Sequence, residues 1–186
     1  LIENGKISEI SENINKECDK VINAEGKYVV PGAVDMNVSL CEPGLEYRED
    51  IKSGTAAAVS GGITSVAAMP YSSPVCDNSS VVSFIKSAAK DRGYANVYPI
   101  AALSKGLSGK ELTEAGDLLE NGAAALSDGA KPVESSSFLR KALEYSSMFG
   151  LPVIVHCEDK DFADGGYMNE GTVSARLGLR AVSYTH

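Results

Sequence analysis

The 186-residue sequence lacks a long apolar run and an excess of basic residues. No stretch approaches the roughly 20 consecutive apolar residues that a membrane-spanning helix requires, so we expect no membrane partner. Lys and Arg together number 17 against 25 Asp and Glu, which gives a formal net charge of −8. Nucleic acids and anionic membrane surfaces attract a basic face, so this balance argues against both as partners.

The cysteines also lack the close spacing that a disulfide framework would show. Cys18, Cys41, Cys76 and Cys157 lie far apart, with no Cys-x-x-Cys pair among them. This spacing is typical of reduced thiols, and the first ten residues carry too many charges for a signal peptide. We therefore expect a cytoplasmic protein. The first residue is Leu1 rather than Met, and we expect residues to be missing at both ends.

The residues that are present predict a folded globular protein. With 44% hydrophobic and 23% charged residues, the chain can build one ordinary domain with a sizeable core. Residues 1–30 have the pattern of short β-strands, because Asn4-Gly5 is a hairpin-turn signal between short apolar segments. Glu25-Gly26 separates Val21-Ile22 from the apolar residues 28–30 in the same way.

From residue 33 onward, apolar strand patterns alternate with helical ones. We expect strands at 33–39, 63–69, 97–102, 123–127 and 153–156, and helices at 49–60, 79–91, 111–120 and 136–149. Repeated strand–helix units with apolar strands predict a parallel sheet covered by helices. The first strand, 33–39, is expected to be buried.

One motif connects this pattern to a known family. Pro31-Gly32, Asp35 and Glu42-Pro43-Gly44 have the spacing of Pro-Gly, a few apolar residues, then Asp-x-His-x-His-x-Arg-Glu-Pro-Gly. The stretch resembles the signature of dihydroorotases, in the cyclic amidohydrolase superfamily. The framing residues are present, but the chemical ones are replaced. Asn37 and Ser39 stand at the two His positions, and Cys41 stands at the Arg position.

The resemblance implies a (β/α)₈ barrel flanked by a small β-sandwich. Residues 1–30 would be the N-terminal part of the sandwich, and residues 31–186 the N-terminal portion of the barrel. A complete barrel needs about 250 residues, so this chain supplies about five of the eight strands as a partial TIM-type barrel. An unclosed parallel sheet exposes its edges and its apolar interior. We therefore expect the isolated chain to aggregate, to oligomerise or to need the missing part.

A second motif follows the strand at 63–69. Residues 69–74, Met-Pro-Tyr-Ser-Ser-Pro, resemble the family's Met-Pro-Asn-x-x-Pro loop. In the family, this Asn and the Arg of the first motif bind the substrate carboxylate. Tyr71 and Cys41 occupy these positions here, and neither can replace an Arg fork on a carboxylate.

A third motif, residues 127–133, resembles Ser-Asp-Asp-Gly-Arg-Pro-Val, whose second Asp bridges the family's metal ions. An ungapped alignment places Gly129 at that position. Asp128 becomes the ligand if the chain has slipped by one residue. The simpler interpretation of Asp128 is a turn-capping residue before Gly129.

A fourth motif, Val155-His156-Cys157-Glu158-Asp159, matches the family's metal-binding His. A lone His after an apolar strand is usually a core or rim residue, but residues 168–178 also resemble the family. His156 is therefore the one ligand position that we interpret as kept. The resemblance places two more functional residues, a His on strand six and an Asp on strand eight, beyond residue 186.

These substitutions predict a protein without normal catalysis. The family hydrolyses the cyclic amide of dihydroorotate to carbamoyl aspartate in pyrimidine biosynthesis, using zinc ions that lower the pKa of water from about 15.7 to about 7. Asn37 and Ser39 are poor zinc donors, so we expect zinc to be absent or weakly bound. The alternatives are an active zinc dihydroorotase, a cysteine-based site of Cys41, His156 and Cys157, and a hydantoinase relative. The last would need a Lys within 123–127, which contains none.

The resemblance also implies a partner. Some dihydroorotase-like chains pair with aspartate transcarbamoylase as inactive scaffolds, and we expect that enzyme as the partner here. A homo-oligomer is the alternative assembly.

Overall fold

A computed structural model describes residues 1–163 and 165–182, and the chain forms two compact units, Leu1–Pro31 and Gly32–His186. In the first unit, β1 (Ile2–Glu3) and β2 (Lys6–Ile7) form an antiparallel hairpin in which Ile2 lies opposite Ile7. The hairpin predicted around Asn4-Gly5 is therefore confirmed.

The second strand pair predicted in residues 21–30 is wrong. Residues 21–30 form only a turn, closed by the Lys27 N–H donating to the Ala24 carbonyl at 2.9 Å. The apolar side chains on either side of it are exposed, Val21 at 82% and Val29 at 76%. Their β-propensity is not expressed because no neighbouring strand in this unit covers them.

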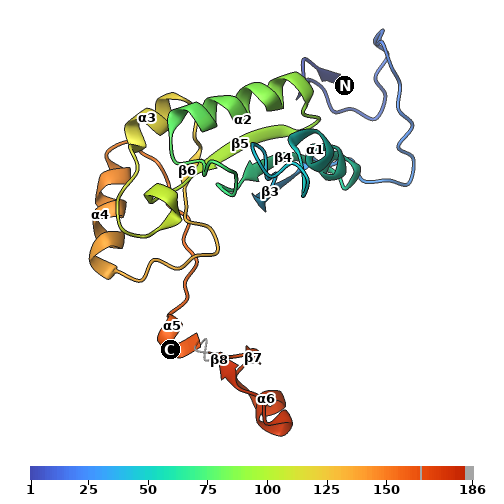
Figure 1. The fold of residues 1–186 in the computed structure, drawn as a ribbon. Coiled ribbons are helices and arrows are strands. Elements are labelled where there is room, and N and C mark those ends of the chain that lie inside the picture. The colour runs from blue at the N-terminus through green and yellow to red at the C-terminus, as the bar shows by residue number, and fades with distance from the viewer. Residues whose placement is uncertain (164, 183–186) are drawn as a thin grey trace. The chain divides into compact units, whose positions relative to one another are not determined.

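The second unit contains a curled parallel sheet, which confirms the predicted α/β class with its partial TIM-type barrel (Figure 1). The strands are β3 (Ala33–Val38), β4 (Ile63–Ala68), β5 (Asn96–Ala101) and β6 (Ala125–Leu126), hydrogen-bonded in that order. The helices that alternate with them are α1 (Ile51–Ser60), α2 (Ser79–Arg92), α3 (Ala115–Glu120) and α4 (Ser136–Ser147).

Side-chain caps fix where the three longer helices begin. The carboxylate of Asp50 accepts from the Ser53 N–H at the start of α1, and this bond holds the pKa of Asp50 below its usual value. Asn78 and Ser135 cap α2 and α4 in the same manner. Each cap satisfies one backbone donor that a helix leaves free at its first turn.

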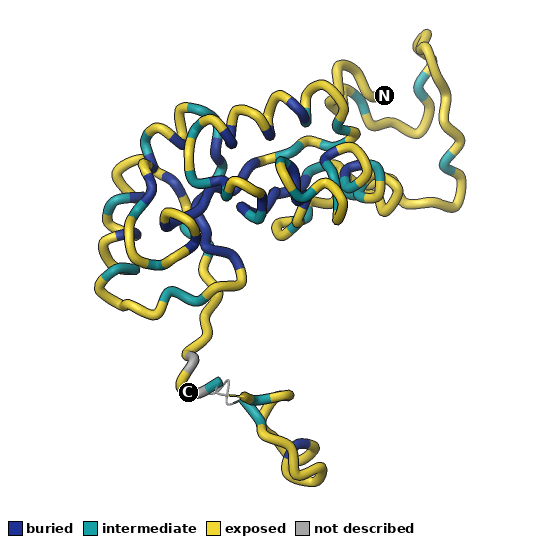
Figure 2. The backbone as a smooth tube through the Cα atoms, viewed as in Figure 1, coloured by how far each residue is buried: buried dark blue, intermediate teal, exposed yellow. Residues whose placement is uncertain are grey.

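Buried residues gather along the strands of the sheet and on one side of α2 (Figure 2). Alternation along the strands divides this core into two clusters. Val66 and Ala68 of β4 face the helices and join a large cluster with residues such as Ile85 of α2. The large cluster comprises Leu40, Ile51, Val66, Ala68, Cys76, Val81, Val82, Ile85, Ala88, Ala101, Leu103, Ala115, Leu118, Ala123, Leu126, Ala142 and Leu151. Ala67 instead points to the concave face, where it packs in a smaller cluster with Met69, Ile100 and Ala125.

The first strand of the sheet is not buried as predicted. In β3, Val34 is 58% exposed and Met36 is 60% exposed. The reason is topological: β3 pairs with β4 on one side, and within the described residues no strand pairs with its other side. Burial in a parallel sheet requires neighbours on both sides, which an edge strand lacks.

Two other elements are shorter than predicted. Residues 111–114 are not helical, and Leu112 forms a bridge with Ser104, so α3 begins only at Ala115. A 3₁₀ turn, η1 (Lys105–Leu107), precedes this segment. The strand predicted at 153–156 is reduced to one parallel bridge between Val153 and Leu126. It cannot extend because β6, its partner, has only two residues.

Four small elements follow. They are α5 (Lys160–Ala163), β7 (Met168–Asn169), α6 (Thr172–Leu177) and β8 (Ala181–Val182), with β7 and β8 paired in parallel. Of the barrel portion predicted at 31–186, residues 164 and 183–186 lie outside the described residues. In the described part of the chain, no helix has the length and hydropathy of a membrane span.

Candidate functional site

The loops that follow β3 and β4 lie against each other and define the edge where the predicted site residues gather. The Ser73 N–H donates to the Pro43 carbonyl at 2.8 Å. Gly44 has φ +87, and a Cβ added to it would lie 2.8 Å from the Ser73 carbonyl carbon and closer still to its oxygen. Only glycine permits this approach, so the Pro43-Gly44 pair joins the two loops.

Glu42 is a buried carboxylate with two structural partners. One oxygen accepts from the Ile51 N–H at 3.0 Å, which satisfies a donor in the first turn of α1. The other oxygen forms an ion pair with Nη2 of Arg92, at the end of α2. Glu42 therefore ties the loop after β3 to two helices that cover the sheet.

Two further framing residues also have a backbone role. A Cβ on Gly32 would lie 2.7 Å from Cβ of Thr64, so the start of β3 needs glycine to approach β4. Asp35 accepts from the Asn37 N–H at 3.0 Å. Five of the six framing residues of the motif, Gly32, Asp35, Glu42, Pro43 and Gly44, thus have a structural partner.

The residues at the two His positions lie on an irregular strand. The pairing of β3 with β4 shifts register between Asp35 and Val38, where three steps along β3 match two along β4. Such an irregularity disturbs the strict alternation that would direct Asn37 and Ser39 the same way. Both residues are exposed, and neither supplies an imidazole.

Two cysteines lie close to this edge in buried positions. Cys41, at the Arg position, has φ +59 and donates weakly from Sγ to the Ser39 carbonyl at 3.7 Å. Burial raises the pKa of the Cys76 thiol to about 12, with a further contribution from the charge of Asp77. A nucleophilic cysteine needs a lowered pKa and access, so Cys76 is a core thiol.

Tyr71, at the family's Asn position, reaches the loop after β6. Its hydroxyl oxygen accepts from the Ala130 N–H, and its side chain packs on the concave cluster. Gly129, which precedes Ala130, lies directly against the ring of Tyr71. The structure therefore brings together Tyr71 and Gly129, two positions that the sequence analysis treated separately.

Asp128 has a different partner, Ser104. It is buried, and its Oδ1 accepts from the Ser104 N–H at 2.9 Å while Oδ2 accepts from the Ser104 hydroxyl. Ser104 in turn accepts from the Gly109 N–H at 2.7 Å. Both oxygens of Asp128 thus hold the loop after β5 rather than an open position where an ion could bind.

His156 lies three residues after Val153, which bridges to Leu126, and its side chain is exposed. Its Nε2 is 2.8 Å from Oε2 of Glu158, and both side chains are partly exposed. Cys157 is exposed as well. Nε2 of this ring is therefore engaged by a carboxylate, and within the described residues no third His, Cys, Asp or Glu joins the pair to form a metal site.

The donors present do not fit the zinc site that the family resemblance implies. Zinc is held by imidazole, thiolate and carboxylate groups in a compact arrangement. Across residues 1–163 and 165–182, no three His, Cys, Asp or Glu side chains cluster so that they could hold a metal ion. The positions implied by the resemblance instead offer an amide, a hydroxyl, a glycine and one imidazole.

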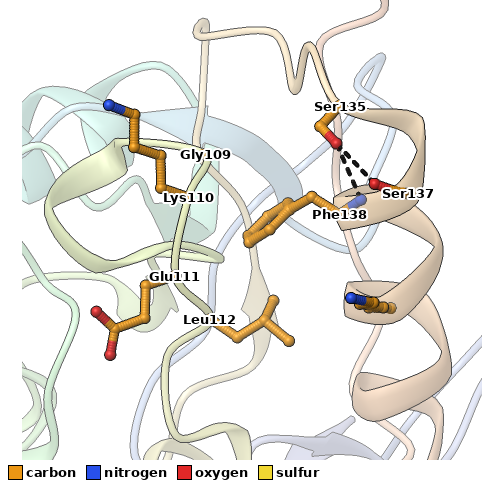
Figure 3. Close-up of a pocket in the computed structure, with 8 residues that line it drawn as sticks. Gly109, Lys110, Glu111, Leu112, Ser135, Ser137 and Phe138 are labelled. Atoms are coloured by element: carbon orange, nitrogen blue, oxygen red, sulfur yellow. Dashed lines mark hydrogen bonds between the residues drawn. The ribbon is translucent and has the colours of Figure 1, made fainter.

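A pocket of about 620 Å³ lies elsewhere, between the segment after η1 and the start of α4 (Figure 3). Figure 3 shows the ring of Phe138 directed from α4 toward this segment. The pocket is lined by Gly109, Lys110, Glu111, Leu112, Ser135, Ser137, Phe138 and Lys141. The hydroxyl of Ser135 caps α4 by accepting from the Phe138 N–H. None of the predicted site residues lines the pocket.

Sequence reasoning missed two residues that shape this edge, Arg92 and Ser104. Arg92 is 50 positions from Glu42, and Ser104 is 24 positions from Asp128. Neither belongs to a local motif. A buried Glu in a turn does require a cation or several donors, but the sequence does not say which residue supplies them.

Comparisons with known proteins agree with the motifs. The sequence model of the family described as Dihydro-orotase-like matches residues 26–185. A dihydroorotase from Acetivibrio thermocellus is 54% identical over 98% of this chain and 43% of its own length. One from Ruminiclostridium cellulolyticum is 51% identical over 97% of this chain and 42% of its own length. The chain thus spans less than half the length of these curated relatives.

A solved structure shares the fold. The L-hydantoinase (dihydropyrimidinase) from Arthrobacter aurescens matches 80% of this chain and 34% of its own chain, with a TM-score of 0.69 and 22% sequence identity. At this identity, the likeness supports the barrel-type fold alone.

Proposed function

Because this chain belongs to the dihydroorotase-like family, we propose that it is a non-catalytic member that keeps the scaffold of a cyclic amide hydrolase. It would not perform the family reaction, the reversible hydrolysis of dihydroorotate to carbamoyl aspartate. Its role would be structural, as part of an assembly with a catalytic protein.

One observation carries this proposal: the framing residues of the motif have structural partners, and the chemical ones have been replaced. Glu42 and Gly44 each hold the loop after β3 in place. Asn37, Ser39 and Cys41, at the family's His and Arg positions, lack the imidazoles and the guanidinium. Losing even a supporting partner of a metal ligand lowers affinity or activity by about 10- to 100-fold, and here ligands themselves are replaced.

An active zinc-dependent dihydroorotase, or a related cyclic amidohydrolase, is the alternative function. His156 and Asp128 favour it, because both are residue types that bind metal and lie near the family's ligand positions. Turnover of dihydroorotate by the zinc-supplemented full-length protein, with the segment that follows residue 186, distinguishes the two functions. The non-catalytic protein gives no turnover above buffer, whereas the active one gives turnover that a chelator abolishes.

The partner that we propose from the family resemblance is aspartate transcarbamoylase. The surface that we propose it covers is the edge strand β3, whose Val34 and Met36 are exposed. We expect the chain to co-elute with the aspartate transcarbamoylase of the same genome in gel filtration. Replacing Val34 and Met36 with Lys should abolish co-elution, because charged side chains on an edge strand oppose packing.

Val59→Lys on α1 is the matched control, since Val59 is also an exposed apolar residue, at 43%. This variant should co-elute like the unmodified chain. Separate elution of the unmodified chain and the enzyme would rule out this partner, and co-elution of the β3 variant would rule out this surface.

A further inference from the structure

Tyr71 connects two loops that are far apart in the sequence. It follows β4, and its hydroxyl accepts from the backbone N–H of Ala130, 59 residues away. Its side chain rests on the concave cluster that includes Met69 and Ile100. The ring therefore lies across the end of the sheet, from the loop after β4 to the loop after β6.

Gly129, the residue before Ala130, has a backbone conformation and a close neighbour that only glycine accommodates. Gly129 has φ +65, in the left-handed region. A Cβ added to it would lie 2.8 Å from Cε1 of Tyr71 and closer still to Cζ and the hydroxyl oxygen. Cβ atoms essentially never approach an aromatic ring this closely, and the ring cannot retreat while its hydroxyl is bonded to Ala130.

We propose that Tyr71 and Gly129 are a coupled pair that closes the edge of the sheet: the tyrosine fills the space that any side chain at position 129 would occupy. The hydrogen bond to Ala130 locks the loop of residues 128–131 against β4. Tyr71 thus fixes the position of this loop relative to β4. The inference does not depend on the proposed function, because the coupling exists whether or not the chain catalyses a reaction.

A double-mutant cycle on thermal unfolding tests the coupling. Gly129→Ala should lower the unfolding midpoint by about 2–12 °C more than Gly150→Ala does. Gly150 is a matched control, since it has φ +68 and nothing within 4 Å of an added Cβ. In a Tyr71→Ala background, Gly129→Ala should lower the midpoint no further than Gly150→Ala does.

A second measurement remains informative if Gly129→Ala fails to fold. Tyr71→Phe keeps the ring and removes only the acceptor, so the Ala130 amide should exchange with solvent at least about tenfold faster. An unchanged exchange rate of the Ala130 amide would show that the Tyr71 hydroxyl does not hold the loop of residues 128–131. Equal midpoint losses for the Gly129 and Gly150 variants, or an additive cycle, would overturn the coupled pair.

Discussion

Gly44→Ala is expected to lower the free energy of unfolding by about 2–5 kcal/mol, because two costs coincide at this position. The residue has φ +87, where an L-side chain is strained by about 1–2 kcal/mol. The added Cβ would also overlap the backbone carbonyl of Ser73, which cannot rotate away as a flexible side chain would. Overpacking of this kind costs about 1–3 kcal/mol. Urea or thermal unfolding measures the loss.

Gly62→Ala separates the two costs. Gly62 has nearly the same φ, +83, but nothing lies within 4 Å of an added Cβ. This variant should lose only the conformational part, about 1–2 kcal/mol. Equal losses in the two variants would show that the loops after β3 and β4 are not in contact as described.

Glu42→Ala is expected to lower the free energy of unfolding by about 2–3 kcal/mol. The substitution leaves the Ile51 N–H without its acceptor and removes the carboxylate that pairs with Arg92. The loss is smaller than for a fully buried pair because the Arg92 side chain is 44% exposed and solvent can hydrate it. Glu42→Gln should lose less, since the amide oxygen still accepts from Ile51.

The matched control is Glu144→Ala on α4. Glu144 pairs with Arg140 one helical turn away, and the two side chains are 62% and 80% exposed. Such pairs contribute about 0.3–0.5 kcal/mol, so the control should barely change stability. A loss at Glu42 no larger than at Glu144 would contradict the structural role assigned to this framing residue.

Local sequence signals predicted the regular elements well where each signal was complete. The helices predicted at 49–60, 79–91 and 136–149 start within two residues of α1, α2 and α4, where the structure shows side-chain caps. The signals failed where strand formation depends on a neighbouring strand. Residues 28–30 have strand propensity but no partner within their unit, and the bridge at Val153 is limited by the two-residue β6.

In the candidate site as well, the local motifs were recognised from the sequence, but the contacts between residues far apart in the chain were not. The motif around Glu42 identified the family from the sequence, but it could not show that Arg92 is the partner of Glu42. Tyr71 and Gly129 were each recognised as substitutions, yet their contact depends on how β4 and β6 are placed in the sheet. Contacts over such separations follow from the tertiary fold, which no local pattern contains.

Zinc content of the full-length protein, measured by elemental mass spectrometry after zinc loading and removal of free metal, tests the central claim that the frame survives without the metal pocket. The Acetivibrio thermocellus dihydroorotase, treated in parallel, serves as the reference. We predict no zinc in this chain above the protein-free blank, and no change on His156→Ala. Two zinc ions per chain, lost when His156 is replaced, would contradict the account.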